Sequence, residues 1–89
     1  MIHIYSDGTE LERKLTRVLS MMSEGDALLL VGDGVLNAGS PLLEGRIVLA
    51  LEADLAARGL DGRLQGARSI SMAEMVDLIA SDASDPISW

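Results

Sequence analysis

Three aspartates follow the apolar segments of this chain and are the side chains best placed for chemistry. Asp7, Asp33 and Asp54 each come shortly after an apolar stretch. In a parallel sheet, the carboxyl ends of the strands face the functional crevice. Carboxylates gathered there could hold Mg²⁺ or act as a general acid and base. Each is explained more simply as a helix cap or first-turn residue, where the helix dipole favours negative charge.

Asp33 lies between two glycines directly after a buried apolar run. One interpretation makes it a ligand, metal or partner contact at the rim of the sheet. The simpler interpretation makes it the N-cap of a helix that begins at Gly34 or Val35. The spacing Gly32-x-Gly34 does not match a dinucleotide fingerprint, and the helix that follows is too short to hold a pyrophosphate.

His3 and Trp89 are the other side chains with distinctive chemistry. The chain has no other histidine and no cysteine. His3 therefore has no thiol and no evident serine to activate, which favours a hydrogen-bonded structural role in the first strand. We expect Trp89 to dock on its own domain or on a neighbouring subunit, since an indole ring is rarely left free in water.

The methionines are concentrated in two predicted helices. Met22, Met72 and Met75 lie on the apolar stripes of those helices, whereas Met21 falls beside its stripe and is expected to be exposed. Flexible thioethers either fill gaps in a core that has little aromatic content or provide an adaptable partner surface.

Hydrophobic periodicity places these residues on alternating strands and helices. Capping-box spacings begin two of the helices, at Thr9 with Glu12 and at Ser71 with Glu74. Gly25 and Gly59 are expected to end helices. The first helix has a stripe that consists of Leu11, Leu15, Val18, Leu19 and Met22, and the last has one that consists of Met72, Met75, Val76, Ile79 and Ala80. Strands are predicted over 1–5, 27–31, 47–51 and 68–71, and shorter helical segments over 35–39 and 52–58.

This alternation predicts an α/β fold. Strands that alternate with helices imply right-handed crossovers and a parallel sheet between helical layers. We expect a three-layer sandwich with a four-stranded, mainly parallel sheet and helices on both faces. A single domain would span residues 1–80, followed by an extended tail over 81–89 that ends in Trp89.

Composition excludes several classes of protein. The 89 residues contain no cysteine, which rules out a disulfide scaffold, a thiolate nucleophile and a Cys-ligated zinc site. A formal net charge of −7 disfavours direct nucleic-acid binding. No apolar run reaches the ~18 residues of a membrane span, and the N-terminus does not look like a signal peptide. A cytoplasmic protein is therefore expected, with no catalytic residue, cofactor or metal.

Several segments together resemble one family. They are Glu24-Gly25-Asp26, Leu28-Leu29-Leu30, Asp33-Gly34-Val35, the stretch from Ala50 to Leu60, the final helix and the closing Trp89. In order, spacing and total length they resemble the TusB or DsrH family of sulfur-relay subunits, and His3 matches an early histidine that is common there. The resemblance implies a DsrE-like fold and a heterohexamer with TusC/DsrF-like and TusD/DsrE-like subunits.

The resemblance also implies a function. Tus complexes pass persulfide sulfur toward the 2-thiolation of wobble uridine in tRNA, and Dsr complexes handle sulfur in sulfur oxidation. DsrH-type chains carry a cysteine seven residues before the glycine that ends the first helix, and Val18 stands there. The chain is thus expected to be a non-catalytic subunit of the Cys-free TusB type.

An alternative is a stand-alone, homo-oligomeric module that binds a small ligand or ion at the Asp33 edge. In either case, five residues are candidates for a partner interface: Asp33, Gly34, Val35, Met21 and Trp89.

Overall fold

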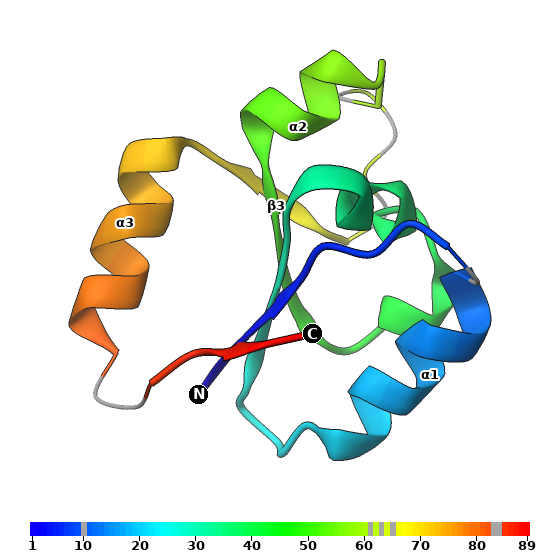
Figure 1. The fold of residues 1–89 in the computed structure, drawn as a ribbon, viewed down its shortest axis with the longest axis vertical. Coiled ribbons are helices and arrows are strands. Elements are labelled where there is room, and N and C mark those ends of the chain that lie inside the picture. Colours follow the sequence, from blue (N-terminus) through cyan, green and yellow to red (C-terminus); the bar gives the residue numbers. More distant parts are fainter. Residues whose placement is uncertain (10, 61, 63, 65, 83–84) are drawn as a thin grey trace.

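The computed structural model describes all residues except 10, 61, 63, 65, 83 and 84. For residue 11 it describes the backbone only. Its centre is a parallel sheet in the order β4-β3-β2-β1-β5 (Figure 1). The strands are β1 (Ile2–Tyr5), β2 (Ala27–Leu30), β3 (Ile47–Leu51), β4 (Arg68–Ile70) and β5 (Ile87–Ser88).

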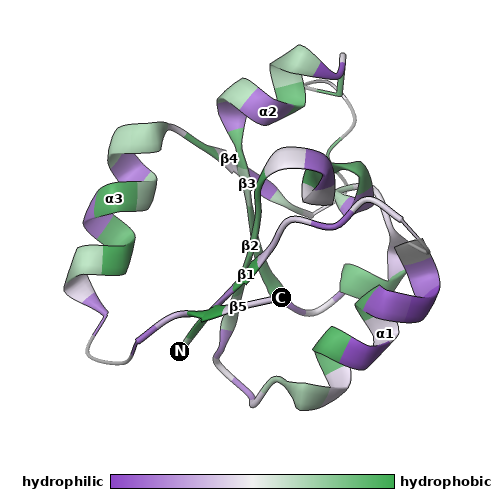
Figure 2. Cartoon of the chain, in the orientation of Figure 1, coloured by the Kyte–Doolittle hydropathy of each residue, from purple (hydrophilic) through white to green (hydrophobic). Residues whose placement is uncertain are grey.

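Helices lie on both sides of this sheet, as predicted for a three-layer α/β sandwich. Helix α1 (Leu11–Met21) covers one face and α3 (Met72–Ser81) covers the other (Figures 1 and 2). Helix α2 (Glu52–Ala57) begins where β3 ends. Two short 3-10 helices, η1 (Gly32–Asn37) and η2 (Pro41–Leu43), join β2 to β3.

Strands β2 and β3 are apolar without alternation because they bury side chains on both faces. Leu28 and Leu30 point into the core beneath α1, whereas Leu29, between them, points into the core beneath α3. The α1 side holds the larger core, to which the helix contributes the buried residues Leu15, Val18 and Leu19. The stripe predicted for this helix is thus confirmed at these three positions; the side chain of Leu11 lies outside the described residues.

The two predicted capping boxes have different outcomes. At the start of α3, the Glu74 amide donates to the Ser71 hydroxyl (3.1 Å) and the Ser71 amide donates to the Glu74 carboxylate (3.0 Å), so this box is confirmed. At the start of α1, the Thr9 amide and hydroxyl both donate to Asp7 instead, at 2.7 Å each. Asp7 outcompetes the predicted partner because a carboxylate two residues away is in reach for a tight turn.

The end of one helix and the start of another differ from the prediction. Helix α1 ends at Met21, four residues before Gly25, which adopts a φ of 88° in the turn that leads into β2. The segment after β2 is a 3-10 helix that begins at Gly32, three residues earlier than expected. Gly59 follows α2 with a φ of 67°, as a left-handed stop should.

The sheet has five strands rather than four. Within the tail 81–89, Ile87 and Ser88 pair with β1, and the Trp89 amide donates to the Ile4 carbonyl at 2.8 Å. The sequence did not reveal this strand because two residues among polar neighbours carry no measurable periodicity.

Helix α3 is rotated relative to its predicted stripe. Met75, Leu78 and Ile79 pack against the sheet, whereas Met72 and Val76 are each 55% exposed. The prediction that Met72 and Val76 lie in the core is therefore wrong. Nearly every turn of α3 carries apolar residues, and the pattern alone does not show which of them face the sheet. None of the helices described here is long and apolar enough to cross a membrane.

The tight contact between η1 and β1 gives a test of this packing. A Cβ added to Gly34 would lie 2.0 Å from the Tyr5 carbonyl oxygen, so Gly34→Ala must push η1 away from β1. We expect a loss of about 2–3 kcal/mol in the free energy of unfolding, measured by urea denaturation. Gly62→Ala is the matched control because no atom of the described residues lies within 4 Å of its added Cβ. Equal losses in the two variants would contradict the close approach.

Candidate functional site

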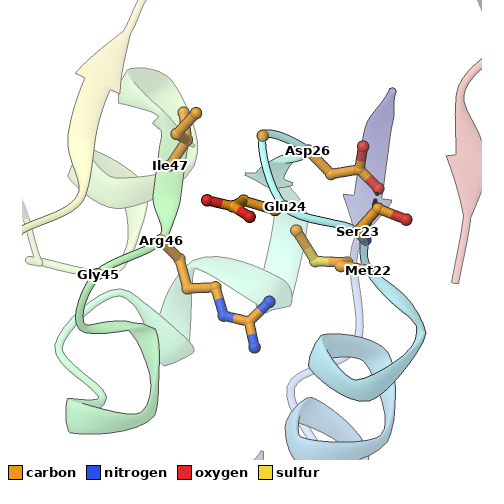
Figure 3. A pocket seen from close by; sticks show the side chains of 8 residues that line it. Met22, Ser23, Glu24, Asp26, Gly45, Arg46 and Ile47 are labelled. Carbon is orange, nitrogen blue, oxygen red and sulfur yellow. Dashed lines mark hydrogen bonds between the residues drawn. The ribbon is translucent and has the colours of Figure 1, made fainter.

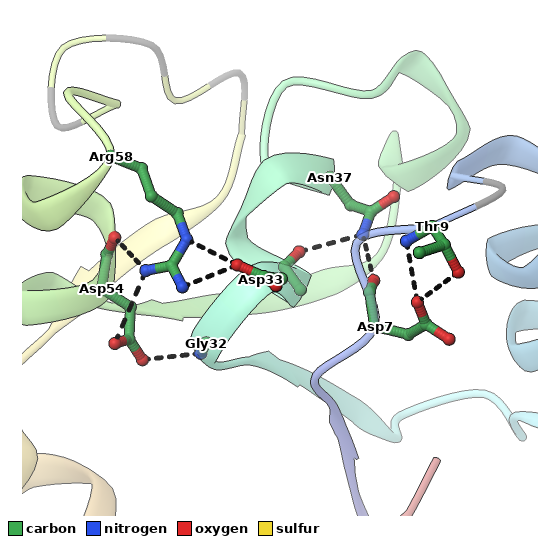
Figure 4. Close-up of polar contacts among 8 residues, drawn as sticks. Asp7, Thr9, Gly32, Asp33, Asn37, Asp54 and Arg58 are labelled. Atoms are coloured by element: carbon green, nitrogen blue, oxygen red, sulfur yellow. Dashed lines mark hydrogen bonds and ion pairs between the residues drawn. The ribbon is translucent and has the colours of Figure 1, made fainter.

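The carboxyl edge of the sheet carries the predicted aspartates, but each is engaged by another group (Figure 4). The Arg58 guanidinium donates to Asp33 through Nε (3.0 Å) and Nη2 (2.7 Å). Asp54 accepts the Gly32 amide at 2.7 Å, and its carboxylate lies 3.8 Å from Arg58 Nη1. Arg58 thus ties the end of α2 to the start of η1.

The Asp7 carboxylate is also engaged by neighbouring side chains and by a backbone amide. Its carboxylate pairs with the Lys14 ammonium and accepts the amide and hydroxyl of Thr9. The bond from Lys14, followed by those from Thr9, holds the pKa of Asp7 well below its ordinary value of 3.8. A carboxylate held in the ionised form is a poor general acid, so the paired-carboxylate mechanism has no support at this edge.

The N-cap interpretation of Asp33 is wrong. The residue before η1 is Val31, which makes no side-chain cap, and Asp33 lies within the first turn. Its carboxylate faces Arg58, a partner 25 positions away that the local pattern did not indicate. Among the residues that the structure describes, no three acidic or histidine side chains gather closely enough to hold a metal ion.

A buried asparagine that the sequence analysis missed supports this edge. The Asn37 amide nitrogen donates to the carbonyls of Gly34 (3.0 Å) and Asp7 (3.4 Å), and the side chain is 2% exposed. It links η1 to the loop after β1 (Figure 4). Its position two residues after the Gly34-Val35 pair, with no polar alternation around it, offered no signal.

A second polar assembly lies near the start of β1, where the His3 side chain bridges Asp26 and Trp89. The imidazole Nε2 lies 2.9 Å from Asp26 Oδ2, and Trp89 Nε1–H donates to Nδ1 at 3.1 Å. The two rings stack with centroids 6.1 Å apart and planes inclined by 22°. The structural role predicted for His3, which is 1% exposed, is confirmed, and Trp89 docks on its own domain.

These two bonds specify the tautomer of His3. An indole N–H only donates, so Nδ1 must accept and the proton must reside on Nε2. Nε2–H then donates to Asp26. Asp26 also accepts the Ser23 amide (2.9 Å) and pairs with the N-terminal ammonium (3.3 Å). The Ser23 amide first, then His3 and the N-terminus, lower the pKa of Asp26 from 3.8 to about 2.

The loops at the amino edge of the sheet enclose an open hollow of about 560 Å³ (Figure 3). It lies between the turn 22–26 and the start of β3, and its lining combines Met22 and Ile47 with Glu24 and Arg46. Within the described part of the chain, the side chains of Glu24 and Arg46 make no hydrogen bond or ion pair, although they lie on facing walls. A lining of mixed charge around apolar groups is typical of the rim of a protein contact.

Five residues were predicted as partner contacts, and the structure buries two of them and exposes the other three. Gly34 and Val35 are buried inside the chain, so in this structure they shape the edge and are not available to a partner. Asp33, Met21 and Trp89 are exposed, with Met21 at 65% and Trp89 at 36%. Exposure makes these three available to a partner without identifying one.

Helix α3 provides a further apolar surface. None of its residues is fully buried, and it leaves a groove of about 540 Å³ against the sheet, whose apolar lining includes Ile47, Leu49 and Ile70. On another side of the helix, Met72 and Val76 are exposed four positions apart, and we call this pair of side chains the α3 face. Single exposed apolar residues are ordinary, but a grouped set marks a contact surface.

Comparison with known proteins identifies the family. The model of the family described as "DsrH like protein" matches residues 10–84. The chain belongs to the DsrH-like family. The match includes α1, where Val18 lies 3% exposed in the core at the position predicted for the cysteine of DsrH-type chains. Membership supports a sulfur-relay-related subunit of a generally non-catalytic kind.

A solved structure has the same fold as this DsrH-like chain. The solution NMR structure of protein Tm0979 from Thermotoga maritima aligns with a TM-score of 0.70 and 25% sequence identity, over 92% of this chain and 94% of that chain. The overall α/β fold is therefore shared between the two proteins. A search of curated proteins gives no match.

The lowered pKa of Asp26 gives a prediction for acid stability. Its ionised form stabilises the folded state above about pH 4, and this contribution is lost as the pH falls through about 2. Asp26→Asn should therefore be less stable than the original chain at pH 7, and the difference should shrink between pH 4 and pH 2. Urea denaturation at several pH values measures it.

The control for this experiment is Glu24→Gln, a change from acid to amide in the same turn. The Glu24 side chain makes no hydrogen bond within the described residues, so its replacement should alter stability at pH 7 little. A pH-independent deficit in Asp26→Asn would show that the ionised carboxylate is not what stabilises this turn.

The tail gives a second prediction. Trp89→Phe keeps an aromatic ring against His3 but removes the indole N–H, and it leaves Nδ1 without its donor. We expect a loss of about 0.5–1.5 kcal/mol and faster amide hydrogen exchange in β5. Ser88→Ala, an exposed change on the same strand, serves as the control. Unchanged exchange in Trp89→Phe would mean that backbone pairing alone holds the tail.

Proposed function

We propose that this chain is an accessory subunit of a cytoplasmic sulfur-relay complex, in which sister subunits carry the persulfide. The single observation that supports this most is a DsrH-like chain with no cysteine, in which Val18 occupies the expected thiol position. The thiolate is the nucleophile in sulfur exchange, so a chain without one contributes through the surfaces it shares with other chains.

The partners in this proposal are a TusC/DsrF-like and a TusD/DsrE-like subunit in a heterohexamer. The α3 face is the part of the surface best suited to such a contact, because it exposes two large apolar side chains on one side of the helix. Met21 and Trp89, on the other side of the sheet, are candidate contacts with a second neighbour. In the absence of sister subunits, the α3 face would favour self-association of the chain.

We further propose that the relay serves 2-thiolation of wobble uridine in tRNA, the route that the resemblance to Cys-free TusB chains implies. The net charge of −7 means that the tRNA phosphates would be bound by sister subunits rather than by this one. The sulfur-oxidation route of the Dsr branch is distinguished by the acceptor that the assembled complex loads.

Co-expression with the two sister chains from the same source tests the assembly. Native mass spectrometry should show a complex that contains all three subunits, and persulfide labelling should mark a sister chain and not this one. Loss of this chain should lower 2-thiouridine in the cellular tRNA. A chain that remains alone in the presence of both sisters would refute the proposal.

The α3 face is tested by charge substitution. Val76→Glu introduces a carboxylate at a position that is 55% exposed, so the monomer should fold normally while the assembly loses at least tenfold in affinity. Leu42→Glu is the matched control, since Leu42 is an exposed apolar residue on η2, away from this face. Equal weakening by the two variants would show that added charge, rather than position, disrupts the complex.

A further inference from the structure

The tail is held on the sheet by a short strand and by one aromatic side chain. Strand β5 pairs with β1 in two places, Ile87 with His3 and Ser88 with Ile4, and both residues of β5 are exposed (Figure 1). The Trp89 amide adds one bond to the Ile4 carbonyl at 2.8 Å. Short segments that bury little apolar surface are among the first to open in a folded domain. The contact between the Trp89 and His3 side chains is therefore an important part of what docks the tail.

This contact requires a neutral His3. Trp89 Nε1–H donates to Nδ1 at 3.1 Å, and Nε2 lies 2.9 Å from Asp26 Oδ2. An indole N–H can only donate, so Nδ1 must keep its lone pair. A proton on Nδ1 would place two N–H groups against each other with no acceptor between them. The docked indole and the imidazolium are thus mutually exclusive in this geometry.

Burial prevents water from relieving that conflict. His3 is 1% exposed, and the Trp89 ring stacks on it with the two centroids 6.1 Å apart. A charged donor that is buried without an acceptor is strongly destabilising. Movement of Trp89 away from the imidazole would open Nδ1 to water. Trp89 is free to make this movement, because it is 36% exposed and is held by the short strand β5.

Two charged groups lie next to the His3 imidazole. The bonds from the Ser23 amide and from His3 lower the pKa of Asp26 to about 2, so this carboxylate stays ionised near neutral pH. Its negative charge favours the imidazolium. The N-terminal ammonium of Met1 lies 3.3 Å from Asp26 and opposes the imidazolium in part. Because the carboxylate is in direct contact with the ring, its effect outweighs that of the ammonium.

The other elements around the imidazole do not compete for its proton. The strand neighbours of His3, Leu28 on β2 and Ile87 on β5, are uncharged. The hollow beside Trp89 is lined by four charged groups: Lys14 and Arg17 of α1, the Asp7 carboxylate that pairs with Lys14, and the carboxylate of Trp89. Groups of these types keep their charge between pH 7.5 and pH 5.5, so they do not make docking depend on pH in that range.

We propose that the tail is an acid-sensitive latch, which is released when Nδ1 of His3 takes up a proton. The docked state binds one proton fewer than the released state, so docking is strongest at high pH and weakens as the pH falls. An imidazole ordinarily protonates at about pH 6.5, and each unit of pH below this lowers the ratio of docked to released tail about tenfold. Release uncovers the outer edge of β1, where β5 pairs. The latch lies within one chain and does not depend on the proposed function.

Hydrogen exchange of the full-length chain tests the latch. The protection factor of the Trp89 amide compares its exchange rate with that of an unstructured peptide at the same pH, and it measures the ratio of docked to released tail. We expect this factor to fall about tenfold between pH 7.5 and pH 5.5. The Leu29 amide, in the centre of the sheet, should change less than twofold, which excludes global unfolding. The ¹⁵N shifts of His3, the only histidine, should show the neutral Nε2–H tautomer wherever the tail is docked.

Two variants assign the effect to the contact between His3 and Trp89. His3→Gln keeps a donor and an acceptor but cannot be protonated, so the protection factor of the residue 89 amide should agree within twofold at the two pH values. This variant keeps the N-terminal amine and so controls for its titration. Trp89→Phe removes the indole donor, which lets Nδ1 carry a proton beneath the ring. Its tail should be held more weakly, and its pH dependence should be less than threefold. Because residue 89 is partly exposed, this variant tests the latch even if His3→Gln does not fold.

Three outcomes would overturn the proposal. One is a protection factor of the Trp89 amide that stays constant from pH 7.5 to pH 5.5. Another is a doubly protonated His3 while that amide stays protected, which would show an imidazolium stacked under the docked indole. The third is an equal fall in His3→Gln or in Trp89→Phe, which would assign the pH dependence to another group. None of these outcomes bears on assembly with sister subunits, so failure of the latch and failure of the proposed function are distinguishable.

Discussion

A buried imidazole needs a partner for each of its two ring nitrogens, and much of this structure is arranged around meeting that need for His3. One partner, Asp26, lies in the turn between α1 and β2, and the other, Trp89, ends the chain. The N-terminus also pairs with Asp26, so the N-terminus and the first crossover meet at this carboxylate, and His3 connects Trp89 to it. In a domain of 89 residues with few aromatic side chains, this polar assembly adds a constraint that aliphatic packing alone does not supply.

The carboxyl edge of the sheet shows how a set of acidic residues can resemble a catalytic site without being one. Asp33 and Asp54 are joined through Arg58, and Asp7 is joined to Lys14. The bonds from Lys14 and Thr9 lower the pKa of Asp7, the opposite of what acid catalysis requires, and Asp33 and Asp54 are both engaged by Arg58. The pairs instead attach α2 to η1 and the loop after β1 to α1, at the edge where parallel α/β sheets commonly hold ligands.

Family membership and the exposed apolar side chains of α3 both favour a role in contacts with other chains. A DsrH-like chain that places Val18 in its core has no thiol to carry sulfur, and the α3 face exposes the apolar side chains of Met72 and Val76. Met21 and Trp89 lie on the opposite side of the sheet from that face.

The sequence by itself determined the fold class, most of the strands, the buried stripe of α1 and the cap of α3, because each depends on local periodicity or on side chains a few residues apart. It also established the absence of a thiol, and with it the limit on this chain's chemistry. Only the tertiary structure decided the fifth strand, the rotation of α3, the pairing of Asp33 with Arg58 and the contact of Trp89 with His3. The last two contacts join residues that lie 25 and 86 positions apart, and their geometry is produced by the packing of the whole sheet rather than by any local pattern.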